Sequence, residues 1–513
     1  MTIGLHQVLM ISTMNGDSMT ASFADHFVRA IPIIGETLRA KRVVLLGLPL
    51  ATPIVEYLAA CGVGRWIIAA APTQAESPNS LLLNRLHMRH GFALAPTLTE
   101  LPLSEWIAAI RDDAADLIIA VGGQQTLAIA RHAAGQAGIP ALLCMPPSTQ
   151  AACRAEVVFP GEAARTPLNV AAEWQRDDAT AEDINAMNGW DWLCAAPLLS
   201  GLARALLLRG SLYERPDLEE LWARGMRIVT LGGTDPCAVD WSLPNTPIRA
   251  VSAHYQSPPM CRGRLLIAGL GSIGSVAAAL LAAYATQLVL ADPDSVDASN
   301  PARQHYTLAD LGCPKACALQ TSLAAQCPQI VAVPDALTDE DQVAALVRQH
   351  GITAALVATG TNADFAIARA LRECHVSHVV ARCYPRARYW EAILVDGTHG
   401  APLDAIRGHL RIGPAPAPTP EQRAAYSDAG ALEAEPATLI ESGWAAAWAA
   451  RLAWQLLMPI GLRERWMIEV LESHNTCLVG GAYVEHTRDG PAYAIDLPGR
   501  IRAWATEQII GAV

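Results

Sequence analysis

The sequence predicts an α/β protein with two doubly wound, Rossmann-like domains that form an intramolecular pseudo-dimer. Apolar strand-like runs alternate with helical runs, which is typical of a parallel sheet covered on both faces. The order of these runs is also repeated along the chain. The segments 42–70 and 264–292 both follow the order strand, turn, helix, strand, and so do 115–144 and 354–383. Such a repeat predicts two similar units side by side.

The chain length supports two domains, because single cores rarely grow beyond ~250–300 residues and this chain has 513. We place an inactive domain at 1–245, a linker rich in proline and serine at 246–262, and an active domain at 263–513. Within the active domain, 411–438 carries alternating prolines and is predicted to be an extended crossover loop.

Composition excludes several classes of protein. A hydrophobic fraction of 52% with 17% charged residues excludes disorder, and a net charge of −12 argues against a nucleic-acid partner. The twelve cysteines include no C-x-x-C pair, and the first residues lack the features of a signal peptide. We therefore expect a reduced, cytoplasmic protein.

The uncharged run 265–291 is long enough to cross a membrane. It contains three closely spaced glycines, however, and it ends abruptly at Asp292. These features favour a buried strand, turn and helix, so we expect no membrane association.

A glycine loop in the second half indicates a nucleotide site. Gly269, Gly271 and Gly274 form G-x-G-x-x-G between a predicted strand and a predicted helix. Glycine lets the backbone approach a phosphate, and the helix N-terminus supplies amide hydrogens. Asp292 ends the next strand about twenty residues later, where a carboxylate can hold ribose hydroxyls.

Basic and amide side chains follow this carboxylate closely. Asn300, Arg303, Gln304 and Lys315 lie in one short stretch, and Lys315 is one of only two lysines in the chain, with Lys41. Arginine offers a planar fork to phosphate oxygens and lysine offers a point charge, which suits a triphosphate. A hydride-transfer enzyme has no need of a lysine here.

At these residues the sequence resembles the ubiquitin-activating-enzyme family, which includes the bacterial ThiF-type adenylyltransferases. The family pattern of glycine loop, D-x-D, N-x-x-R-Q and G-x-x-K is matched at 269–274, 292–294, 300–304 and 312–315. The resemblance implies ATP and Mg²⁺ as cofactors. The nucleotide-binding residues that it implies are Gly269, Gly271, Gly274, Asp292, Asp294, Asn300, Arg303, Gln304 and Lys315.

The first half resembles the inactive partner of such a pair. Its glycine loop is reduced to Gly47-Leu-Pro-Leu-Ala-Thr, and alanines occupy 69–71 where Asp292 stands in the second half. The segment 24–43 resembles the opening segment of the family, whose arginine reaches the partner's ATP site. Arg29 is the residue at that position, so the resemblance implies a catalytic role for it.

The resemblance also implies the chemistry. The tail carboxylate of a small ubiquitin-like protein attacks the α-phosphate of ATP, with Arg29, Arg303, Lys315 and Mg²⁺ neutralising charge. Where the family carries a metal-binding aspartate, this sequence has Thr361, and the nearest carboxylate is Asp364. Either Asp364 or Asp294 would hold the metal, or the coordination is looser. The cysteine pairs that bind zinc in many relatives are absent, so no structural zinc is expected.

Transfer of the adenylate to a cysteine would separate conjugating systems from sulfur-transfer ones. Cys383 is the best candidate because it ends a predicted strand near several arginines, which favour a thiolate. Cys313 and Cys477 are weaker candidates, Cys374 is expected in the core, and 411–438 contains no cysteine.

The architecture most resembles the activating enzyme of a bacterial ubiquitin-like conjugation operon, such as the Bil antiphage system, with a conjugating enzyme as its second partner. Two alternatives remain open. One is adenylation alone, feeding sulfur transfer or peptide modification. The other is a non-catalytic scaffold, which the missing aspartate at Thr361 suggests.

Overall fold

A computed structural model of the chain describes the two sheets and the helices around them. The described residues are 37–47, 50–69, 78–90, 96–102, 105–106, 110, 115–146, 153–161, 189–211, 216–231, 239–242, 263–327, 329–383, 390–398, 402–404, 439–457, 475–479, 482–487 and 490–495. Arg29, the expected linker at 246–262 and the expected loop at 411–438 lie outside them. The domain boundaries therefore stay predictions.

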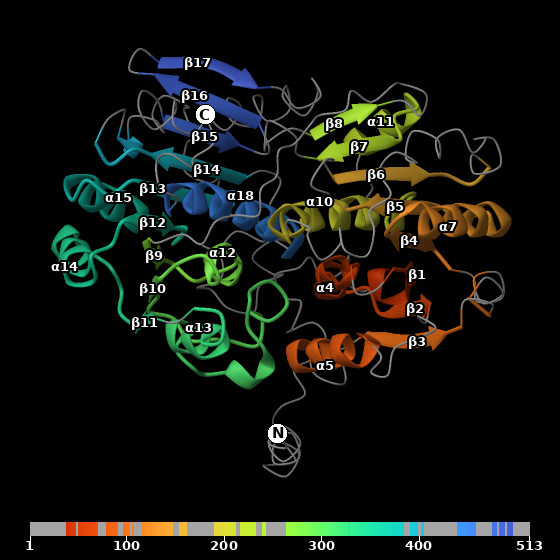
Figure 1. The fold of residues 1–513 in the computed structure, drawn as a ribbon, viewed down its shortest axis with the longest axis horizontal. Helices are drawn as coiled ribbons and strands as arrows, with labels where there is room; N and C mark the ends of the chain where they lie inside the picture. Colours follow the sequence, from red (N-terminus) through yellow and green to blue (C-terminus); the bar gives the residue numbers. More distant parts are fainter. Residues whose placement is uncertain are drawn as a thin grey trace, which may run out of the picture.

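The first sheet lies in the N-terminal half and has eight strands in the order β3-β2-β1-β4-β5-β6-β7-β8 (Figure 1). The strands from β3 to β5 pair in parallel, and β6, β7 and β8 are added antiparallel. The strands are β1 (Arg42–Leu46), β2 (Arg65–Ala69), β3 (Thr97–Leu101), β4 (Leu117–Val121), β5 (Ala141–Met145), β6 (Cys153–Val158), β7 (Ile228–Leu231) and β8 (Val239–Ser242).

The second sheet repeats this order with nine strands, β11-β10-β9-β12-β13-β14-β15-β16-β17. The strands from β11 to β13 are parallel and the others are antiparallel. The strands are β9 (Arg264–Ala268), β10 (Gln287–Ala291), β11 (Ile330–Val333), β12 (Ala354–Val357), β13 (His378–Cys383), β14 (Trp390–Val395), β15 (Asn475–Val479), β16 (Ala482–Thr487) and β17 (Gly490–Ile495). The predicted fold class, two doubly wound α/β units, is confirmed.

Helices cover both faces of each sheet. On β9, Leu265 and Ile267 pack against α12 and α18, whereas Leu266 and Ala268 pack against α14 and α15. This follows because successive strand side chains point to opposite faces. In the first half the helices are α4 (Thr52–Ala60), α5 (Pro78–His90), α7 (Gln124–Ala137), α10 (Gly189–Leu207) and α11 (Pro216–Ala223). In the second half they are α12 (Gly274–Leu281), η1 (Leu308–Asp310), α13 (Lys315–Leu323), α14 (Glu340–His350), α15 (Ala363–Glu373) and α18 (Leu439–Leu457).

Helices of the two halves contact each other. Helices α4 and α10 of the first half contact α18 of the second, as Figure 1 shows at the centre of the molecule. Tyr57 on α4 lies directly over Gly443 on α18. Ile440 on α18 belongs to the apolar core of the first half, and Ala60 on α4 belongs to that of the second. The apolar core of each half therefore contains a residue from the other half.

The uncharged run 265–291 forms the strand β9, a turn, α12 and the strand β10, as predicted. Helix α12 has only eight residues. Within the described residues, no helix combines the length and the apolar character that a membrane span requires.

Candidate nucleotide-binding site

The glycine loop connects β9 to α12. Gly269 has a φ of +86°, and a Cβ there would lie 2.5 Å from the backbone of Ala358, so this position requires glycine. A Cβ at Gly274 would lie 1.8 Å from the carbonyl oxygen of Gly269. Gly271 differs, because nothing lies within 4 Å of its ideal Cβ position. Two glycines therefore shape the turn, and the third leaves open backbone before a helix N-terminus, which suits a phosphate.

Asp292 follows β10 and ties the glycine loop to that strand. Its Oδ2 accepts a hydrogen bond from the backbone N–H of Leu270 at 2.5 Å, and its Oδ1 accepts one from that of Asp294 at 2.9 Å. The residue is buried, and burial raises the pKa of the carboxyl, although the Lys315 charge and the two backbone donors oppose this. Each oxygen keeps a second lone pair, so the carboxylate can also accept a ribose hydroxyl.

Lys315 is the first residue of α13, where the helix dipole disfavours a positive charge. Its side chain is 8% exposed, and Nζ lies 2.7 Å from Asp294 Oδ2 and 4.0 Å from Asp292 Oδ1. An antiparallel bridge between Ser295 and Pro314 brings the two segments together. Two carboxylates therefore hold a buried cation beside the glycine loop.

Asn300, Arg303 and Gln304 lie in one compact turn after β10. The carbonyl oxygen of Asn300 accepts hydrogen bonds from the backbone N–H groups of Arg303 at 3.0 Å and Gln304 at 2.8 Å. Nη1 of Arg303 donates to Oγ of Ser272 in the glycine loop at 2.9 Å. The Asn300 side chain donates to Asp297 at 2.6 Å and so stabilises the turn itself. Arg303 is thus the member of this set that touches the glycine loop.

The turn after β12 differs from the metal site that the resemblance implies. Asp364 is fully buried, and its Oδ1 accepts hydrogen bonds from the backbone N–H of Thr359 at 3.1 Å and its hydroxyl at 2.6 Å. Its Oδ2 accepts one from Nε of Arg382 at 2.5 Å, and Arg382 also donates to the carbonyl of Thr361. The residues here do not fit a divalent cation unless Arg382 moves.

No other metal cluster compensates within the described ranges. They contain no group of three or more His, Cys, Asp or Glu side chains that could hold a metal ion. Asp294, the second carboxylate expected to bind metal, has a side chain that is 67% exposed and pairs with Lys315. The metal roles of Asp364 and Asp294 stay predictions.

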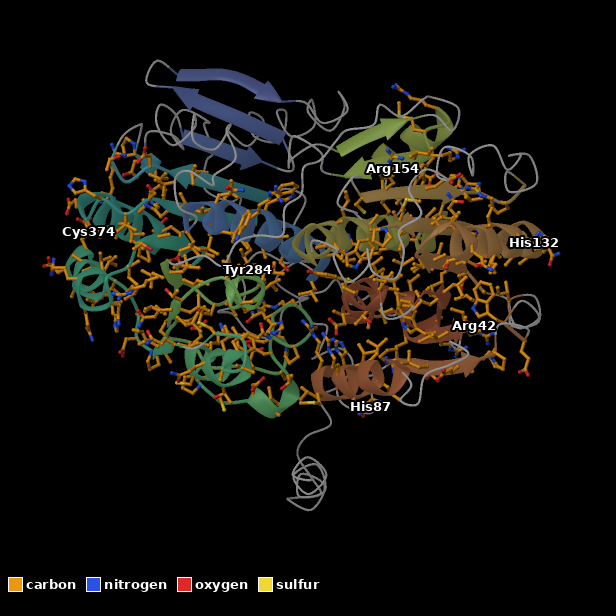
Figure 2. The ribbon with its side chains drawn as sticks, in the orientation of Figure 1. Arg42, His87, His132, Arg154, Tyr284 and Cys374 are labelled. Atoms are coloured by element: carbon orange, nitrogen blue, oxygen red, sulfur yellow. The ribbon has the colours of Figure 1, made fainter. Side chains whose placement is uncertain are left out.

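The candidate cysteines lie in different places. Cys383 is the last residue of β13, but its side chain lies outside the described part, and so does that of Cys477 in β15. Cys313 is exposed in the loop before Lys315. Cys374, which was expected in the core, is half-buried at the C-cap of α15 and packs against the core from its edge (Figure 2). The transfer role of Cys383 stays a prediction.

Two residues that the sequence did not single out also support the site. The hydroxyl of Tyr306 donates to the carbonyl of Leu270 at 2.9 Å, and burial raises the pKa of this phenol. A buried tyrosine hydroxyl needs a partner, so its place after the N-x-x-R-Q motif was a usable signal. Arg89 on α5 donates to the carbonyls of Pro301 and Gln304 from the other half of the chain. No local pattern marks Arg89.

The first half keeps part of the same loop. Gly47 has a φ of +102°, and a Cβ there would lie 1.8 Å from the carbonyl oxygen of Val121. Thr52 begins α4 five residues later, just as Gly274 begins α12 five residues after Gly269. The turn is therefore retained where backbone packing requires it, while the glycines that open the second loop to a ligand are absent.

These features define an α/β protein with Rossmann-type sheets and a candidate nucleotide site in its second half. Residues 260–377, which contain the glycine loop, Asp292, Arg303 and Lys315, match the model of the ThiF family. The match covers 118 of the 513 residues of the chain. A comparison with curated protein sequences gave no match.

Among solved structures, the chain is similar to MccB of E. coli. The complex of MccB with succinimide has 11% sequence identity and a TM-score of 0.33, over 45% of this chain and 64% of that one. The complex with ATP has 12% identity and a TM-score of 0.32, over 46% and 64%. The microcin C7 biosynthetic enzyme MccB with N-formylated MccA has 11% identity and a TM-score of 0.33, over 46% and 64%. These similarities span less than two thirds of the solved chains.

Proposed function

We propose that this protein uses ATP to adenylate the C-terminal carboxylate of a small ubiquitin-like protein. The observation that carries the proposal is Lys315. It is a buried lysine at a helix N-terminus, held 2.7 Å from Asp294 beside an open glycine loop, inside the region that matches the ThiF family model. Asp294 and Asp292 hold the Lys315 ammonium beside the loop, where it can also attract the negative charge of a bound polyphosphate.

The described residues fit ATP. The backbone at Gly271 is open, and the start of α12 offers amide hydrogens to a phosphate. Arg303 supplies a positive charge at Ser272 of the glycine loop, and Lys315 supplies a second one beside Asp292, which holds that loop. Asp292 keeps acceptor capacity for the ribose.

The reaction needs positioning more than covalent help from the protein. A carboxylate oxygen of the partner's tail attacks the α-phosphorus, the bond from that phosphorus to the bridging oxygen of the β-phosphate breaks, and pyrophosphate leaves. Fixed positive charges stabilise the developing negative charge. Mg²⁺ is part of the proposal and would add charge neutralisation, with Asp294 a better fit than Asp364 because its carboxylate is exposed.

A thioester step extends the proposal. The Cys383 thiolate would attack the acyl carbon of the adenylate and release AMP, and the acyl group would then pass to a conjugating enzyme. Cys383 ends a parallel strand at the same sheet edge as the glycine loop, which supports this choice. We place the protein in a cytoplasmic, ubiquitin-like conjugation pathway of the antiphage type.

Exchange of labelled pyrophosphate into ATP tests the adenylation step. The full-length protein is assayed with Mg·ATP and a β-grasp protein that ends in glycine, taken from a neighbouring gene. We expect exchange that depends on this partner, and a loss of about 100-fold or more in Lys315→Ala and Asp292→Ala. Lys41→Ala is the matched control, because it removes the only other lysine, which pairs with Asp116 in the first half.

The outcomes separate the alternatives. Absence of exchange with the cognate partner would leave the non-catalytic scaffold. Exchange without a reductant-sensitive adduct between enzyme and partner would leave adenylation alone, feeding sulfur transfer or peptide modification. An adduct that disappears in Cys383→Ser supports the thioester, and an adduct that persists places it on another cysteine.

A further inference from the structure

Arg89 of the first half reaches into the second half. It lies near the end of α5, which contacts η1. Its Nε donates to the carbonyl oxygen of Pro301 at 2.7 Å, and its Nη2 donates to that of Gln304 at 2.6 Å. The two acceptors lie 212 and 215 residues further along the chain.

The two carbonyls flank Arg303. Pro301 and Gln304 are both buried, and the backbone N–H groups of Arg303 and Gln304 donate to the carbonyl of Asn300 in the same turn. Arg303 in turn donates to Ser272 of the glycine loop at 2.9 Å. A continuous series of hydrogen bonds therefore runs from α5 to the glycine loop.

The chemistry of the contact indicates that Arg89 does more than hold the two halves together. Burial lowers the pKa of Arg89, although Glu56 and Tyr57 oppose this shift. An apolar side chain would join the halves without that desolvation cost. A guanidinium instead offers two parallel donors in a rigid fork, which fixes the direction of both carbonyls.

We propose that Arg89 is a positioning residue, which fixes from the first half the turn that carries Arg303 in the nucleotide site of the second. The inference rests on the proposed function for the identity of the ligand, ATP. It gives the first half a role in the site that is independent of Arg29.

The test uses the full-length protein, with Arg89→Ala, Arg89→Lys and the control Arg85→Ala. Arg85 lies one turn earlier on α5 and pairs with Glu56 at 2.6 Å. Three quantities are measured: the dissociation constant for ATP by calorimetry, hydrogen exchange of the backbone amides of Arg303 and Gln304, and the thermal midpoint. Arg89→Ala should weaken ATP binding about tenfold and speed exchange at Arg303 and Gln304, because two hydrogen bonds are lost. Arg89→Lys should lie between it and wild type, and Arg85→Ala should match wild type.

Unchanged exchange and an unchanged dissociation constant in Arg89→Ala would overturn the inference and leave Arg89 as an interface residue. A lower thermal midpoint with wild-type ATP binding would do the same. If Arg89→Ala does not fold, Arg89→Lys decides: weaker ATP binding at the wild-type midpoint supports positioning, and equal binding overturns it. If wild type binds no ATP, the proposed function fails, and the exchange measurement alone supports or overturns the positioning role.

Discussion

At the scale of single residues, two buried charged groups in and beside the candidate site have an opposite charge in contact. Lys315 lies between Asp292 and Asp294, and Asp364 pairs with Arg382. The second pair bears on the metal, because the resemblance places a metal-binding carboxylate at Thr361. The structure places the Arg382 guanidinium beside that turn, where it pairs with Asp364.

Asp364→Asn tests whether this ion pair or a metal organises the turn. The carboxylate is fully buried and the Arg382 side chain is 14% exposed, so removing the charge should lower the free energy of unfolding by about 3 kcal/mol. The loss should be the same with and without Mg²⁺, since Arg382 supplies the charge. Urea unfolding in about 5 mM EDTA and in about 5 mM Mg²⁺ measures the loss of unfolding free energy under both conditions.

Thr361→Ala is the control, because it removes a hydroxyl of the same turn and leaves the ion pair in place. Its unfolding free energy should fall by no more than about 1 kcal/mol. A Mg²⁺-dependent stabilisation of the wild type that Asp364→Asn abolishes would instead establish Asp364 as a metal ligand.

At the scale of elements, the contacts between the two halves include a pair of helices with related sequences, α10 and α18. Ser200-Gly201 on α10 corresponds to Ser442-Gly443 on α18. The surroundings of the two glycines differ, however. A Cβ at Gly443 would lie 2.4 Å from the ring of Tyr57, whereas one at Gly201 would lie 3.5 Å from Ile440. The two helices are therefore similar in sequence, but the packing around their corresponding glycines differs.

The two glycine-to-alanine substitutions should have opposite effects. Gly443→Ala should lower the free energy of unfolding by about 1–2 kcal/mol, because the Tyr57 ring must shift. Gly201→Ala should raise it by about 0.5–1 kcal/mol, since the new methyl makes an ordinary contact and alanine favours a helix. Urea unfolding of both variants measures the effects. Equal changes in the unfolding free energy would contradict the prediction that the two glycines pack differently.

The sequence predicted the parts of the fold and site that local pattern determines. Apolar strand runs and the repeated order of elements predicted both sheets, and the spacing of Gly269, Gly271 and Gly274 predicted the loop. The Arg89 and Arg382 contacts could not be found this way. Each contact depends on how separate elements pack, and the hydrophobic periodicity that predicts strands and helices does not mark a partly buried arginine.

At the scale of the whole molecule, the burial of two histidines makes the stability of the fold depend on pH. Burial lowers the pKa of His378 in β13 to about 4, and the charge of Arg372 acts in the same direction, while a hydrogen bond with Val376 opposes it. Burial likewise lowers the pKa of His305 to about 4, helped by Arg89 and Arg85 of the first half. Both imidazoles are therefore neutral in the folded protein at pH 7.

The sign of the pH dependence follows from these directions. In the unfolded chain a histidine takes up its proton near pH 6.5, whereas folded His378 does so only near pH 4. Between these values the unfolded state binds more protons, so stability is greatest above pH 6.5 and falls as the pH drops toward 4. For His378 the loss of unfolding free energy between pH 7 and pH 5 is about 2 kcal/mol.

His378→Gln should remove that part of the pH dependence, measured by urea unfolding at the two pH values. His132→Gln, which changes an exposed histidine on α7 (Figure 2), should leave the slope as in wild type. A His378→Gln slope equal to that of wild type would show that folded His378 takes up a proton as easily as it does in the unfolded chain. The same measurement on His305→Gln extends the argument to the contact between the halves, because acid would place a third positive charge beside Arg85 and Arg89.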